Sequence, residues 1–97
     1  MIVGRHIKII SEYKYMANEY LKGAILEVVE NQLKSLNPPE TKETYDRLLG
    51  MGYSERDAKE MIGVVVSSEI FDVMKKKEPF NKDRFVKALN KLPEHPK

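Results

Sequence analysis

Two pairs of acidic residues have a spacing that could bring carboxylates together on helix faces. Glu27 and Glu30 are three residues apart, as are Asp57 and Glu60. Residues three apart share one face of an α-helix, and inward-facing carboxylates from adjacent helices hold metal ions in some helical bundles. Such sites normally also contain histidine, and the chain has only two, near its opposite ends. A solvated helix surface explains the four carboxylates better, and carboxylate-based metal binding is the alternative.

A second pattern mixes aromatic and basic residues near the N-terminus: Tyr13, Tyr15 and Tyr20 with Lys8, Lys14 and Lys22. Tyrosines interleaved with lysines can stack on bases and pair with phosphates. Glu12 and Glu19 interrupt this stripe. Tyr13 and Tyr20 also fit the apolar period of a helix. Core packing plus a solvated face is therefore the preferred interpretation, and weak nucleic-acid binding is a third possibility.

The sequence offers no constellation for covalent catalysis or cofactor binding. Cysteine is absent, which excludes disulfides, iron–sulfur clusters and cysteine-ligated zinc. His6 and His95 lie near the termini without a structured neighbourhood that would form a triad. No glycine-rich phosphate loop is present. The sequence therefore favours a non-enzymatic protein and predicts no catalytic residue, cofactor or metal.

Composition narrows the class of protein further. The chain has 97 residues and 17 basic against 15 acidic side chains, a net charge of +2. One domain is the default at this length, and so small a net charge does not indicate a nucleic-acid partner. No segment approaches the roughly 20 apolar residues of a membrane helix, and the N-terminus lacks the ordered zones of a signal peptide. We expect a cytoplasmic protein without a membrane partner.

The positions that would carry these groups lie on predicted helices. Apolar residues recur every three to four positions from Tyr13 to Leu36, which predicts a long first helix over about 11–36 that forms the spine of the domain. Further helices are predicted over about 38–51, 54–77 and 81–92. The result is an all-α, four-helix single domain over residues 1–97, in which 94–97 form a frayed tail and the structure of 1–10 is uncertain.

The predicted helix boundaries rest on capping signals. Asn37 should cap the second helix, with Pro38 at its first position. Gly52 suits the left-handed position after that helix, with Tyr53 packing back near its last turn. Ser54 and Asn81 should cap the third and fourth helices.

The segment Met51-Gly52-Tyr53, followed by Ser54 and Ala58, resembles the Met-Gly-Phe/Tyr loop of ubiquitin-associated domains. In that class of domain the loop presents an apolar patch to a partner. The resemblance covers Leu48 to Ile62; beyond it, the next predicted helix is about twice as long as in those domains. Capping alone also explains every residue of the segment.

A wider resemblance joins Val28-Val-Glu-Asn-Gln-Leu33, Asn37-Pro-Pro-Glu40, Arg47-Leu-Leu and Gly52-Tyr-Ser. This set resembles the DUF1841-like family of small, uncharacterised helical proteins from bacteria and archaea, over roughly residues 20–75. The resemblance implies a helical fold and supplies no activity. Common members carry histidines at positions that are Leu26, Arg56 and Glu60 here. If those relatives bind metal through them, this chain lacks the ligands.

Together these patterns predict a protein–protein interaction or assembly module that binds a protein partner or itself, with a homodimer as the simplest form. The candidate contact residues are large apolar side chains: Ile2, Val3, Ile7, Ile9, Ile10, Met51 and Tyr53. Residues 1–10 resist assignment, since their apolar side chains could extend the long helix, form a short strand or pack against a partner chain.

Overall fold

The computed structural model describes residues 19–94 of the chain. Four helices occupy them: α2 (Glu19–Ser35), α3 (Pro39–Gly50), α4 (Glu55–Lys76) and α5 (Lys82–Lys91). No strand occurs between residues 19 and 94, so the prediction of an all-α, four-helix domain is confirmed. The valine run Val64–Val66 belongs to α4.

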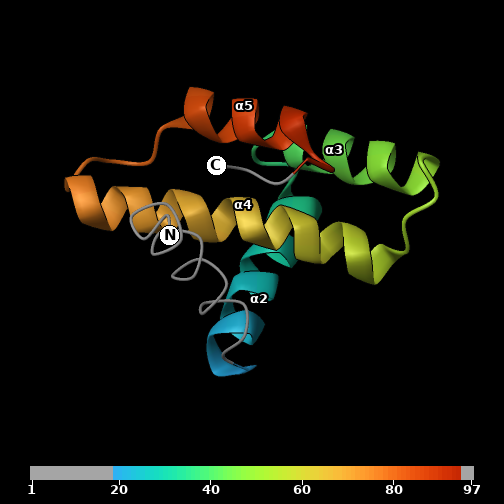
Figure 1. The fold of residues 1–97 in the computed structure, drawn as a ribbon, viewed down its shortest axis with the longest axis horizontal. Helices are drawn as coiled ribbons and strands as arrows, with labels where there is room; N and C mark the ends of the chain where they lie inside the picture. The colour runs from blue at the N-terminus through green and yellow to red at the C-terminus, as the bar shows by residue number, and fades with distance from the viewer. Residues whose placement is uncertain (1–18, 95–97) are drawn as a thin grey trace, which may run out of the picture.

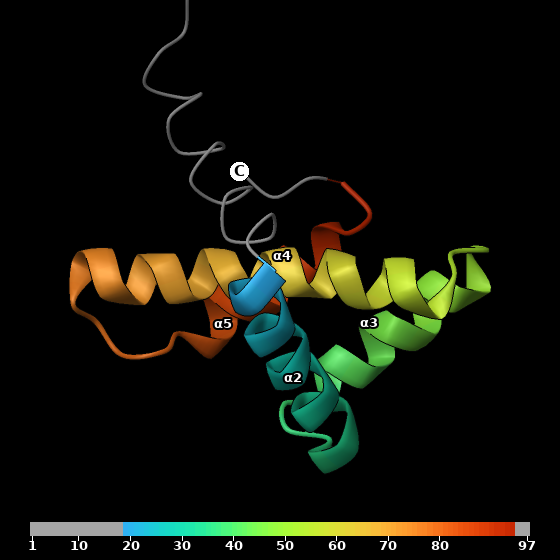
Figure 2. The ribbon, with the colours of Figure 1, turned by 90° about the horizontal axis from the view of Figure 1, so that it is seen from below.

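Helix α4 is the longest element of the described part, and both α4 and α3 contact each of the other three helices. Helix α2 crosses α4 steeply, whereas α3 and α5 run at a shallower, oblique angle to it (Figures 1 and 2). The prediction that the first helix is the spine is therefore wrong for these residues, because α2 packs against α3 and α4 but not α5. The predicted start of that helix, residues 11–18, lies outside the described residues.

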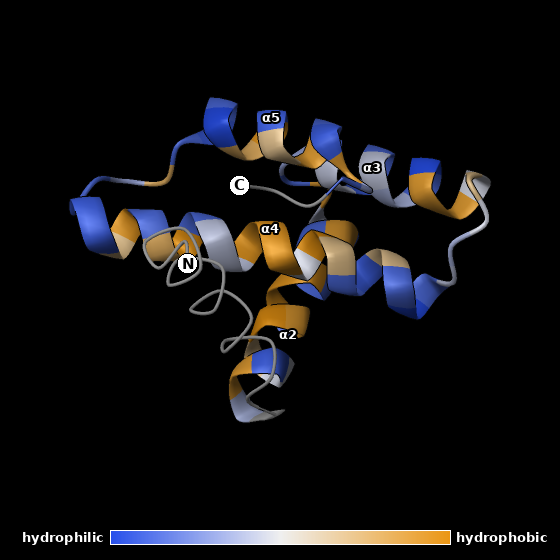
Figure 3. Cartoon of the chain, viewed as in Figure 1, coloured by the Kyte–Doolittle hydropathy of each residue, from blue (hydrophilic) through white to orange (hydrophobic). Residues whose placement is uncertain are grey.

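The core forms where α4 meets its neighbours. Its buried apolar side chains are Ile25 and Val29 from α2, Leu48 from α3, Ala58, Ile62, Val65 and Val66 from α4, and Phe85, Leu89 and Leu92 from the C-terminal segment. The two ends of α4 and the outward side of α5 are hydrophilic (Figure 3). Helix α4 buries apolar residues on more than one face because helices pack on several of its sides.

The exposure of α2 departs from the predicted core period. Tyr20 near its start is 86% exposed, and Leu36 just beyond its end is 54% exposed, whereas Ile25 and Val29 are buried. Val28, in the middle of the helix, lies on the side turned away from the core and is exposed as well. The expectation that Tyr20 belongs to the core is wrong. A helix that crosses its partner steeply buries only the residues near the crossing point, so a period running the full length of the helix overstates its contact.

The capping predictions are confirmed except at α3. The Ser54 and Asn81 side chains accept hydrogen bonds from the backbone N–H groups of Asp57 and Arg84, both at 3.0 Å. Helix α3 starts one residue later than predicted: its N-cap is Pro38, without a side-chain cap, and Pro39 is in the first turn. The earlier helix ends with Leu36 in the left-handed region at φ 56°, so Asn37 belongs to the link.

Candidate functional site

The turn between α3 and α4 holds two of the predicted contact residues in a fixed backbone. Gly52 has φ 100°, and its N–H donates to the Leu49 carbonyl at 3.0 Å while the Tyr53 N–H donates to the Leu48 carbonyl at 3.2 Å. This pair of bonds is the predicted Schellman cap. Met51 and Tyr53 remain 53% and 37% exposed. The turn therefore presents two large side chains to solvent from a hydrogen-bonded support.

Arg47 connects this turn to the C-terminal end of α5. Its Nη1 and Nη2 groups donate to the carbonyls of Leu92 and Leu89 at 2.7 and 3.0 Å. Nη1 also lies 4.0 Å from the Met51 sulfur. The guanidinium is a donor to the Leu92 carbonyl and a second donor to the Leu89 carbonyl, which also accepts from the Leu92 N–H at 3.1 Å, and its charge suits the negative end of the helix dipole. Arg47 therefore links the exposed turn to the end of α5.

The carboxylates predicted as a metal alternative do not converge on one point. Glu30 of α2 accepts a 2.7 Å hydrogen bond from Lys59 of α4, and Glu60 of α4 lies 2.9 Å from Lys22 of α2. Glu27 and Asp57 are exposed. No group of three or more metal-ligating side chains occurs among residues 19–94. One member of each predicted pair, Glu30 or Glu60, instead forms an ion pair between α2 and α4.

Each of these two ion pairs shifts the pKa of one of its members in the direction that favours the charged form. The hydrogen bond from Lys22 lowers the pKa of the Glu60 carboxyl. The hydrogen bond to Glu30 raises the pKa of the Lys59 ammonium. The Glu60 carboxyl and the Lys59 ammonium are both charged at neutral pH. Lys22 pairs with Glu60, whereas the nucleic-acid hypothesis requires this lysine to contact a phosphate.

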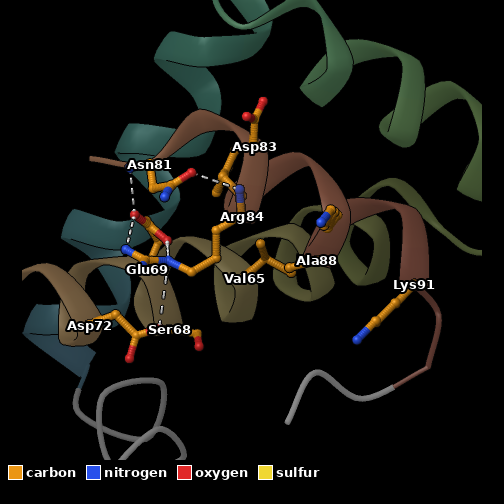
Figure 4. A pocket seen from close by; sticks show the side chains of 11 residues that line it. Val65, Ser68, Glu69, Asp72, Asn81, Asp83, Arg84, Ala88 and Lys91 are labelled. Atoms are coloured by element: carbon orange, nitrogen blue, oxygen red, sulfur yellow. Dashed lines mark hydrogen bonds and ion pairs between the residues drawn. The ribbon is translucent and has the colours of Figure 1, made fainter. Parts of the chain in front are cut away.

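The most buried charged group was not singled out from the sequence. Glu69 of α4 is only 6% exposed, and its carboxylate accepts three hydrogen bonds of 2.9 Å, from Arg84 Nε, Arg84 Nη2 and the Asn81 backbone N–H. Figure 4 shows Arg84 reaching from α5 down to this carboxylate. The arrangement is a bidentate ion pair, and the hydrogen bond from the Asn81 N–H also links Glu69 to the start of α5.

The electrostatics of Glu69 combine two opposing effects. Burial alone would raise the pKa of its carboxyl, but the hydrogen bonds from Arg84 and the Asn81 backbone outweigh that effect, and the pKa is lowered. The same contact raises the pKa of Arg84. A hollow of about 410 Å³ between α4 and α5 lies beside this pair. Since the carboxylate is fully engaged, it is poorly suited to act as a general base.

The spacing of apolar residues along α4 does indicate that Glu69 faces the core. Glu69 follows the buried Val65 and Ile62 by four and seven residues, and these spacings keep one face of a helix turned toward the core. A charged residue at such a position needs a buried partner. No local pattern distinguishes Arg84 from the other basic residues that follow Glu69 in the sequence.

Several predicted residues lie outside the described part of the chain. These are the N-terminal contact candidates Ile2, Val3, Ile7, Ile9 and Ile10, together with Tyr13, Tyr15, His6 and His95. The prediction of a contact surface at residues 1–10 therefore stays a prediction.

The chain matches no known protein family, no curated protein and no solved structure. The resemblance to the DUF1841-like family consequently stays a prediction, as does the local likeness to the loop of ubiquitin-associated domains. Between residues 19 and 94, no helix has the length and apolar character needed to cross a bilayer.

Proposed function

We propose that this chain is a non-enzymatic protein–protein interaction or assembly module of the cytoplasm, and that the α3–α4 turn is one of its contact surfaces. The observation that carries the proposal is the exposure of Met51 and Tyr53 on a turn fixed by two backbone hydrogen bonds. Tyrosine, methionine and arginine are enriched in protein interfaces, and Arg47 lies beside Met51. A rigid support lowers the entropy lost on binding.

The chemistry of the described residues supports binding over catalysis. The buried carboxylate of Glu69 is held by three donors, and the carboxylates between α2 and α4 are paired with lysines. Neither arrangement leaves a free base next to a nucleophile, which acid–base and covalent catalysis both require. Carboxylate-based metal binding has no geometric support among residues 19–94.

Self-association is the simplest form of the proposal, since most soluble oligomers are homo-oligomers. We expect size-exclusion chromatography with light scattering at tens of micromolar to show a dimer. The double substitution Met51→Ser/Tyr53→Ser should shift it toward monomer, and deletion of residues 1–10 should do the same if that segment contributes. Met74→Ser, another exposed methionine on α4, is the matched control and should leave the dimer unchanged.

A strict monomer at that concentration, unaffected by the deletion and by both substitutions, would rule out self-association. Retention of the dimer in the Met51→Ser/Tyr53→Ser variant would exclude the α3–α4 turn as its interface. A thermal-shift screen with divalent metals tests the alternative function, carboxylate-based metal binding, because a metal bound by the native state raises the melting temperature.

A further inference from the structure

The Met51 thioether lies beside a hydrogen-bond donor that the fold holds in place. Arg47 and Met51 are four residues apart at the end of α3, and Arg47 Nη1 lies 4.0 Å from the Met51 sulfur; this spacing brings helical side chains together. The Met51 N–H donates to the Arg47 and Leu48 carbonyls, both at 3.1 Å. Since the guanidinium is bound to the end of α5, both members of the contact are fixed.

The Arg47 guanidinium has more donors than its contacts with α5 use. It carries several N–H groups in a rigid fork, of which one on Nη1 donates to the Leu92 carbonyl and one on Nη2 to the Leu89 carbonyl. Nη1 therefore has a second N–H for an acceptor at Met51. A thioether sulfur is only a weak acceptor, so the contact would become stronger if the sulfur carried an oxygen.

We propose that Met51 is a site of reversible oxidation by peroxide and that Arg47 binds the resulting sulfoxide. A sulfur lone pair attacks one oxygen of hydrogen peroxide and the O–O bond breaks. The proton of the transferred oxygen passes to the leaving hydroxide, so the products are the sulfoxide and water. Met51 is 53% exposed and therefore open to peroxide. The new oxygen stands one bond length from a sulfur that is 4.0 Å from Nη1, which allows an N–H···O hydrogen bond of about 2.7–3.2 Å.

The Arg47 contact distinguishes Met51 from the other methionines of residues 19–94. Met74 is 63% exposed, but no donor of the described residues contacts its sulfur, and Met61 packs against the core. Oxidation makes the methionine side chain polar, and methionine sulfoxide reductases reverse the change. Oxidised Met51 would thus remove apolar surface beside Tyr53 while Arg47 keeps the turn folded. The consequence for association rests on the proposed function of this turn.

The test compares melting temperatures before and after hydrogen peroxide treatment, with mass spectrometry reporting which methionines are oxidised. Four full-length chains are used: the native chain, Arg47→Leu, and each of these with Met51→Leu. The Met51→Leu chains report the effect of oxidising the other methionines, which is subtracted. We expect Met51 oxidation to lower the melting temperature of Arg47→Leu by about 3–6 °C more than that of the native chain. Equal shifts in the two backgrounds would overturn the proposal.

A second measurement does not depend on the folding of Arg47→Leu. The side-chain N–H resonances of Arg47 in nuclear magnetic resonance spectra should move when the native chain is oxidised and stay in place for Met51→Leu. Unchanged resonances in the oxidised native chain would also overturn the proposal.

Light scattering tests the consequence for association separately. The dissociation constant of the native dimer should rise about fivefold or more on oxidation, and that of Met51→Leu should not change. A dimer unaffected by Met51 oxidation would refute the control of association by oxidation. A native chain that is monomeric before treatment would instead contradict the proposed self-association, and the melting temperatures and Arg47 resonances would still decide whether Arg47 binds the sulfoxide.

Discussion

Replacing Glu69 by glutamine tests the energetic role of the buried ion pair. The native carboxylate accepts three hydrogen bonds from Arg84 and Asn81. A glutamine side chain has one acceptor oxygen, and its NH₂ group would face a donor. At least one donor therefore loses its acceptor. A hydrogen bond to a charged group contributes about 1.5–3 kcal/mol, so we expect the free energy of unfolding to fall by about 2–3 kcal/mol.

Urea unfolding followed by circular dichroism measures this change, and the melting temperature should fall by about 10–20 °C, since 1 kcal/mol shifts a domain of this size by about 4–8 °C. Glu60→Gln is the matched control on the same helix. Its carboxylate pairs with Lys22 and Arg56, but the side chain is 28% exposed, and exposed pairs contribute about 0–1 kcal/mol. Equal losses in the two variants would refute the reasoning from burial.

The pH dependence provides a second readout of the same group. The folded-state pKa of Glu69 is lowered, so its contribution to stability is fully present above the unfolded value of about 4.3. It is lost as the pH falls through the lower folded-state pKa. The stability difference between the native chain and Glu69→Gln should therefore be constant near neutral pH and shrink below about pH 4. A difference that grows on acidification would contradict the assigned direction.

Substitutions at Arg84 test whether Glu69 and Arg84 stabilise the fold as a pair. Removing one partner of a buried pair leaves an uncompensated charge, whereas replacing both by apolar residues can be nearly neutral. Arg84→Met should therefore be less stable than the double variant Glu69→Met/Arg84→Met. A double variant at least as unstable as the sum of both single variants would show that the residues do not act as a pair.

Four further substitutions test individual positions by urea unfolding. Ser67→Ala should raise the free energy of unfolding by about 0.5–1.5 kcal/mol, because the Ser67 hydroxyl is buried without a hydrogen-bond partner and alanine favours helix; a loss of stability would indicate a partner for that hydroxyl. Gly23→Ala should stabilise the fold by about 0.5–1 kcal/mol, since a Cβ there meets open space. Gly52→Ala should instead destabilise it by about 1 kcal/mol or more, because φ at this residue is 100°. A change of the same sign in both variants would contradict this reasoning about backbone conformation. Arg47→Met should destabilise by about 1–2 kcal/mol by removing the side-chain donors to the Leu89 and Leu92 carbonyls, and an unchanged midpoint would show that water replaces the guanidinium.

Local signals explain how much of the fold was predictable. A capping residue, a left-handed glycine and a proline each act within a few residues of the chain, so their effect can be recognised without knowing the tertiary structure. For that reason α4 and α5 begin within a residue of their predicted starts, after Ser54 and Asn81, and the turn at Gly52 has the predicted hydrogen bonds. The error at Asn37 is of one residue, because adjacent prolines both suit the start of a helix.

By itself, the sequence determined the helical class, the number of helices in the described part and the turn that exposes Met51 and Tyr53. Only the tertiary structure decided that α3 and α4, and not α2, contact all the other described helices, that Tyr20 is solvent-exposed and that Glu69 pairs with Arg84 across 15 residues. The physical reason is that helix periodicity reports which residues could be buried, whereas the crossing of two helices decides which are. The partner of a charged residue follows from that crossing. Two of the four carboxylates that suggested a metal site, Glu30 and Glu60, accordingly form ion pairs between α2 and α4.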